Sequence, residues 1–88
     1  MADSTVDLLR QRLAALAPTA LEIADESHRH VGHAGAREGG HFRVDIVAVI
    51  FSGRGTLARH RLVYDAAGDL MRGRIHALSI NARSPDEV

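Results

Sequence analysis

The chain contains no cysteine. That absence excludes disulfide bonds, zinc sites built from cysteine, thiol nucleophiles and iron–sulfur clusters held by the chain's own thiolates. Lysine is absent too, so all 11 basic residues are arginine, and they balance 11 acidic residues. With histidine neutral the net charge is zero, which gives no reason to expect a polyanionic partner for the chain as a whole.

Long apolar stretches are also missing. The longest, residues 46–51, has six residues, whereas a membrane-spanning helix needs roughly 20. Asp3 and Asp7 lie where a secretory signal would be basic and then apolar, so no signal peptide is expected. A length of 88 residues, 45% of them apolar and 25% charged, suits one globular domain. We therefore expect a cytoplasmic, non-membrane protein with a single domain over residues 1–88 and its core over about 6–83.

Helical periodicity marks the first segment, residues 4–17. Ser4 and Asp7 have the spacing of a capping box, whose side chains pair with free N–H groups at a helix start. Apolar residues recur on one helical face, and these are Val6, Leu9, Leu13 and Leu16. Pro18 forces the preceding residue out of helical geometry. The segment therefore predicts a docking helix that ends near Ala17 and carries no chemistry.

Three segments have the alternation of β-strands. Residues 20–27 show one apolar face, and residues 75–82 form the last strand. Residues 42–51 give the strongest signal, and their second face becomes apolar after Asp45. Both faces are therefore expected to be covered at that end. Residues 84–88 are expected to form a frayed acidic tail.

The connections between these strands predict the topology. Residues 28–40 contain four glycines and three histidines, which predicts a flexible loop and suits an antiparallel pair. Thr56 can cap a second helix that runs to about residue 71 and is broken at Gly68. A helical connection allows a parallel neighbour. The expected fold is α+β, with the order helix–strand–strand–helix(–helix)–strand and a mixed three-stranded sheet covered by helices on one face.

Histidine is unusually frequent, with six in 88 residues. The six are His28, His30, His33, His41, His60 and His76. Because neutral imidazole is a common metal ligand, loop histidines could converge on one that a strand holds in place. The structural alternative is that loop histidines are exposed without a function. In that alternative His76, sharing its parity with Leu78 and Ile80, is partly buried. The spacing His-x-His-x-x-His matches no closed zinc site.

A basic cluster, Arg59, His60 and Arg61, lies near the start of the second helix. Its arginines could contact phosphate or an acidic partner, or they could form a solvated face. His60 lies three residues after Leu57 and four before Tyr64, which favours an inward, structural role for this histidine. The chain has no Gly-x-Ser-x-Gly, no phosphate-binding loop with lysine and no cysteine nucleophile. An enzyme is therefore not expected.

Four short stretches, taken in their order and spacing, resemble the BolA family over about residues 8–85. They are Asp25-Glu26-Ser27 with the loop that follows, His41-Phe42-Arg43-Val44, Phe51-x-Gly53 with Arg59-His60-Arg61-Leu62-Val63-Tyr64, and Ile75-His76-Ala77-Leu78-Ser79-Ile80. The resemblance implies a fold similar to the type II KH domain, which agrees with the order of elements predicted above.

The resemblance also implies a monothiol glutaredoxin as partner and a [2Fe–2S] cluster shared with that partner and glutathione. The family's histidine ligand at the start of the last strand corresponds to His76. A second ligand comes from the loop between the first two strands. There the alignment points to His30, with His33 as its neighbour and His41 as a lesser candidate. Histidine ligation raises the reduction potential, and protonated imidazole cannot coordinate. The implied role is a non-enzymatic adaptor in cluster assembly, trafficking or iron sensing.

The family is also associated with transcriptional regulation, and KH-like folds can bind nucleic acid. Residues 53–74 contain five arginines and two aspartates, a local net charge of +3. The candidate contacts to DNA or a partner are Arg54, Arg59, Arg61 and Arg74. A DNA-binding regulator is therefore the alternative function, and an adaptor without metal is a third. The sequence leaves the oligomeric state open, a homodimer included.

Overall fold

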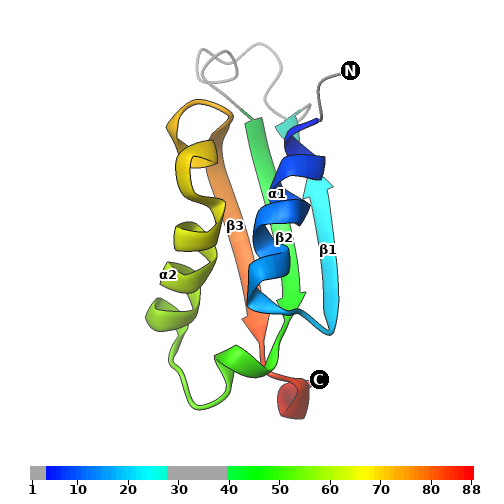
Figure 1. Cartoon of the computed structure of the whole chain (residues 1–88), viewed down its shortest axis with the longest axis vertical. Helices are drawn as coiled ribbons and strands as arrows, with labels where there is room; N and C mark the ends of the chain where they lie inside the picture. The colour runs from blue at the N-terminus through cyan, green and yellow to red at the C-terminus, as the bar shows by residue number, and fades with distance from the viewer. Residues whose placement is uncertain (1–3, 28–39) are drawn as a thin grey trace.

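Within residues 4–27 and 40–88, which the computed structural model describes, two α-helices cover one face of a three-stranded sheet (Figure 1). The elements in chain order are α1 (Thr5–Leu13), the 3₁₀ turn η1 (Ala14–Leu16), β1 (Ala20–Asp25), β2 (Gly40–Val47), the turn η4 (Val49–Phe51), α2 (Thr56–Ala67), the turn η5 (Gly68–Arg72), β3 (Ile75–Arg83) and the turn η6 (Pro85–Glu87). None of the helices in these two ranges is both long and apolar enough to cross a membrane.

The sheet has the order β1-β2-β3. β1 pairs with β2 in antiparallel fashion, with Ala20 opposite Val47. β2 pairs with β3 in parallel, with Val44 opposite Ile80. The predicted α+β class, the mixed sheet and the single helical layer are therefore confirmed.

The core lies between the central strand and the two helices. Alternate residues of β2 are buried on the helix side, and the other buried apolar side chains come mainly from α1, α2 and the turns. The fully buried or nearly buried members include Leu9, Leu13, Phe42, Val44, Ile46, Phe51, Val63, Ala67, Leu70 and Ile75. The apolar face predicted for the first helix is confirmed, because Leu9, Leu13 and Leu16 are all buried.

Hydrogen-bonding caps and backbone conformation explain where α1 and α2 begin and end. The N–H of Asp7 donates to Ser4 Oγ over 3.1 Å, which confirms Ser4 as the cap of α1, the first of the two hydrogen bonds in the predicted capping box. The chain leaves right-handed geometry at Ala17, whose φ is 53°. The N-cap of α2 is Gly55, so the prediction of a cap at Thr56 is wrong by one residue. Gly68, with φ 58° and ψ −127°, separates α2 from η5 as predicted, in a region that favours glycine.

The central strand differs from its prediction at both ends. It begins at Gly40, inside the predicted loop, because the Gly40 N–H donates to the Arg74 carbonyl over 3.0 Å. It ends at Val47 rather than at residue 51, since the chain turns into η4 to bury Phe51. Val47, on the second face, is 8% exposed, whereas Val49 and Ile50 are 67% and 37% exposed; the expectation of two covered faces is therefore confirmed at Val47 and wrong beyond it.

The C-terminal segment is folded, not frayed. Ser84 is 1% exposed and caps η6 in a capping box, with its N–H donating to Glu87 Oε1 over 2.7 Å. Arg59 Nη1 lies 2.5 Å from the same carboxylate oxygen. These contacts fix residues 84–87 against the end of β3 and the start of α2.

The contacts in this turn lead us to expect an unusually low pKa for the Glu87 carboxyl group. The hydrogen bond from Arg59, followed by those from the backbone and side chain of Ser84, lowers the pKa of Glu87 from its usual 4.5 to about 2. Because the folded pKa lies below the unfolded one, the ionised carboxylate stabilises the fold above pH 4.5, and this contribution is lost as pH falls through about 2. We expect ¹³C NMR to show the Glu87 carboxyl titrating near the lower value. A midpoint near the usual one would contradict the contact with Arg59.

Candidate functional site

A β-bulge reverses the side-chain alternation at the start of β3. Gly40 pairs with Ile75, and the next residue, His41, pairs with Ala77, so His76 is the extra residue of the parallel ladder. As a result Ile75 and Leu78, three residues apart, both face the core, while His76 is exposed. The prediction that His76 shares its parity with Leu78 and is partly buried is therefore wrong.

The bulge brings two histidines together. The ring centroids of His41 and His76 lie 5.1 Å apart, with the ring planes tilted by 46°. His41 is half-buried and directly precedes the buried Phe42, so by strand alternation it faces the side of the sheet opposite the helices. An imidazole nitrogen binds a metal such as zinc at about 2 Å, so rings this close can approach one ion. Among the described residues, His41, the lesser of the three candidates for the second ligand, lies beside His76.

The backbone of His41 is held by the end of β1. Its N–H donates to Ser27 Oγ over 3.0 Å, and its carbonyl accepts from the Glu26 N–H over 2.8 Å. The Ser27 N–H in turn donates to Asp25 Oδ1 over 2.9 Å, a local turn that aims the hydroxyl at β2. Sequence reasoning missed this role for Ser27. The Asp-x-Ser spacing at a strand end was the available signal.

At Gly40, the residue before His41, there is no space for a side chain. A Cβ on Gly40 would lie 2.5 Å from Cε2 of Phe42 and 2.7 Å from Ser27 Oγ. We therefore expect Gly40→Ala to lower the free energy of unfolding by about 1–3 kcal/mol, the usual cost of overpacking. Urea unfolding of the wild-type chain and of Gly40→Ala measures this difference in the free energy of unfolding.

Gly55→Ala is the matched control for that substitution. A Cβ there has open space within 4 Å, and the one expected cost is that alanine is a poorer N-cap than glycine, so we expect a loss of about 0.5–1 kcal/mol, smaller than at Gly40. An equal effect at both glycines would show that backbone entropy, not the contact with Phe42 and Ser27, governs Gly40.

The remaining histidines divide into two cases. His28 and the two loop candidates for the second ligand, His30 and His33, lie outside the described residues. His60 lies on α2 and is half-buried, but Leu57 and Tyr64 are 66% and 40% exposed. The predicted inward face of Leu57, His60 and Tyr64 is therefore wrong. Across residues 4–27 and 40–88, no group of three or more His, Asp or Glu side chains is placed to hold a metal.

The candidate arginines do not form one surface. Arg59 is largely buried, with 12% of its side chain exposed. Arg54 is exposed and donates from Nε to the Ile50 carbonyl over 2.8 Å. Arg61 and Arg74 are exposed. The loop before α2 and the start of β3 lie at opposite ends of the sheet in Figure 1, so Arg54 and Arg74 are far apart.

Comparison with known proteins decides the family. The family described as BolA-like protein matches residues 13–87. The chain belongs to the BolA family. It is 44% identical over 71 residues to BolA-like protein 1 of Mus musculus, an alignment that covers 81% of this chain and 50% of that protein. It is 42% identical over 79 residues to SufE-like protein 1 of Arabidopsis thaliana, covering 83% of this chain and 21% of that protein.

A solved structure and a bacterial relative are also similar to this chain. The BolA domain of SufE1 from Arabidopsis thaliana superposes with a TM-score of 0.86 at 40% identity, covering 100% of both chains. The DNA-binding transcriptional regulator BolA of Escherichia coli K12 is 35% identical, covering 84% of this chain and 73% of that protein. The chain thus spans from about a fifth to three quarters of these longer relatives, and it matches an isolated BolA domain from end to end.

Proposed function

We propose that this BolA-family chain is a non-enzymatic adaptor. It binds a monothiol glutaredoxin and shares with it a glutathione-assisted [2Fe–2S] cluster, for cluster assembly, trafficking or iron sensing. The observation that carries the proposal is the adjacency of His41 and His76, 5.1 Å apart at a β-bulge. Bulges re-aim side chains and are enriched beside functional sites.

The donor set fits such a shared group. The chain has no cysteine, so it can offer imidazole nitrogen, and the thiolates must come from the partner and glutathione. His76 is exposed and accessible to a partner, while Ser27 and Glu26 fix the backbone of His41. Hydrogen bonds that fix the backbone of a ligating residue also fix the position from which its side chain reaches a metal. When bound, a cluster with histidine on one iron has a higher reduction potential than one held by thiolates alone.

A spectroscopic titration with the wild-type chain tests this proposal. It is added to a cluster-loaded monothiol glutaredoxin with glutathione, and visible absorption and circular dichroism are recorded. We expect new bands that saturate with the added chain, because exchanging a ligand on one iron changes the electronic environment of the cluster. An unchanged spectrum at a large excess of the chain would overturn the proposal.

DNA binding is the second candidate function. The regulator name of the Escherichia coli relative supports it, together with the exposed Arg61 on α2; Arg54 and Arg74 are exposed as well but lie at opposite ends of the sheet. Binding to a DNA duplex should weaken steeply with salt, and each lost phosphate contact should lower the slope by about 1. Arg61→Gln is the variant of choice, with Arg10→Gln on α1 as control. A flat salt dependence would argue against this function.

A further inference from the structure

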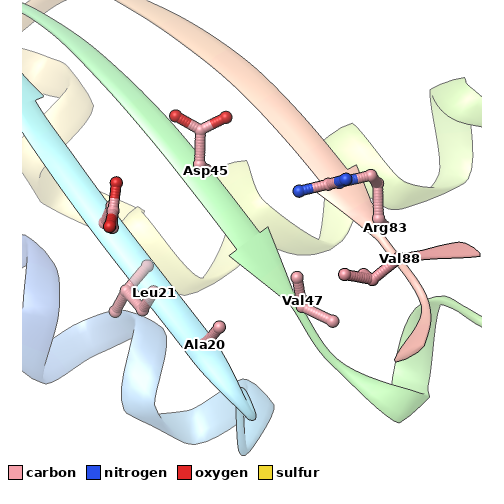
Figure 2. A pocket seen from close by; sticks show the side chains of 7 residues that line it. Ala20, Leu21, Asp45, Val47, Arg83 and Val88 are labelled. Atoms are coloured by element: carbon pink, nitrogen blue, oxygen red, sulfur yellow. The ribbon is translucent and has the colours of Figure 1, made fainter.

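The face of the sheet opposite the helices carries a hollow of about 380 Å³ (Figure 2). Its walls include Leu21 and Glu22 of β1, Asp45 and Val47 of β2, Arg83 of β3, and Val88. This volume lies at the lower end of small-molecule sites, which suits a ligand the size of a dipeptide. The hollow lies at the end of β2 opposite His41, so it is separate from the histidine pair.

Arg83 brings an unpartnered cation to this hollow. Its Nε is buried and lacks a hydrogen-bond partner within the part of the chain that the structure describes. No described carboxylate forms an ion pair with it. In Figure 2 its side chain reaches from β3 across the sheet toward β2. The buried Nε is out of a ligand's reach, but the guanidinium group lines the hollow, so its outer nitrogens are where a ligand carboxylate would pair with the charge of Arg83.

An unpartnered anion lies on the opposite wall. Glu22 pairs in register with Asp45. The Asp45 carboxylate accepts from Asn81 Nδ2 over 3.1 Å and lies 3.4 Å from Arg43 Nε. Glu22 has no hydrogen bond or ion pair among the described residues. Between Glu22 and Arg83 lies Val47, an apolar side chain that is 8% exposed.

We propose that this hollow binds a small zwitterion of amino-acid or dipeptide size. The ligand carboxylate pairs with Arg83, its ammonium group pairs with Glu22, and its apolar part lies on Val47 and on Ala20, which pairs with Val47 in register. A simple anion or cation would satisfy one wall and leave the other unpaired. A zwitterion satisfies both, and charge-assisted hydrogen bonds at each end fix its direction.

Three probes that differ by one charge test this proposal on the full chain. They are glycyl-L-leucine, its N-acetyl derivative, which lacks the cation, and its C-terminal amide, which lacks the anion. In ¹H–¹⁵N NMR titrations we expect glycyl-L-leucine to shift the amides of residues 21, 22, 47 and 83. Each modified probe should bind about tenfold more weakly, the factor for one lost charged contact. No shifts at tens of millimolar, or equal shifts from all three probes, would overturn the proposal.

Two variants assign the ends of the ligand. In Arg83→Gln we expect glycyl-L-leucine and its amide to bind equally, because the carboxylate has lost its partner. In Glu22→Gln the dipeptide and its N-acetyl form should bind equally. Arg10→Gln, an exposed arginine on α1, should keep the wild-type order of the three probes. If Arg83→Gln kept the full preference for the free carboxylate, the assignment would be wrong, and the same spectra would show whether the variant is folded.

Discussion

Replacing His76 with alanine is expected to abolish the spectral change that the wild-type chain produces in a cluster-loaded glutaredoxin. The bulge exposes this imidazole, whereas its neighbours Ile75 and Leu78 remain in the core. Alanine at an exposed bulge position removes a donor without opening a core cavity. We therefore expect thermal unfolding to stay within a few degrees of wild type while the new visible bands disappear.

His60→Ala is the matched control for this loss. It removes one imidazole from α2, where the ring is half-buried and lies on another element, so the bands should persist. Retention of the bands in His76→Ala would exclude His76 as a ligand. Their loss in both variants would show that the signal depends on folding or charge and not on one nitrogen.

The same measurement distinguishes the second ligand. We compare His41→Ala, His30→Ala and His33→Ala. The structure supports His41, whose ring lies 5.1 Å from that of His76; the family resemblance points to His30, which lies outside the described residues. Complete loss of the bands would mark a ligand. A loss of about 10–100-fold in affinity would instead mark a residue that positions His76 from outside the ligand set.

Periodicity in the sequence predicted the fold well because the core repeats regularly. Phe42, Val44 and Ile46 alternate along β2, and Leu9 and Leu13 follow one helical face, so simple patterns identify them. The same reasoning failed at His76, because alternation assumes a strand without a bulge. Its signal was that Ile75 and Leu78 are both apolar at a spacing of three, which no continuous strand can bury on one face.

The C-terminal turn was missed for a different reason. Residues 84–87 have the Ser-x-x-Glu spacing of a capping box, with Pro85 at the first helical position. Position at the chain end suggested fraying instead. The deciding contact, from Arg59, comes from 28 residues earlier in the chain. No local pattern predicts such a pairing, and it also removes Arg59 from the set of free cations.

Arg59→Met is expected to destabilise the fold strongly, although it replaces a charged residue outside the apolar core. Arg59 donates from Nε to the Arg54 carbonyl over 2.7 Å, and from Nη1 to the Ala82 carbonyl over 3.0 Å and to Glu87 over 2.5 Å. It thereby joins the start of α2 to β3 and to the C-terminal turn. Hydrogen bonds from a charged group contribute about 1.5–3 kcal/mol each and are not additive. We expect urea unfolding to show a loss of about 3 kcal/mol.

Arg61→Met is the control, two positions along the same helix. Its side chain is exposed, and we expect a change within about 0.5 kcal/mol. Equal stability losses at the two positions would contradict the structural role of Arg59. The comparison also bears on DNA binding, since an affinity lost in Arg59→Met can follow from a loosened α2 and not from a missing phosphate contact. A salt slope that falls by about 1 in Arg61→Met, with unfolding unchanged, is the result that identifies a phosphate contact.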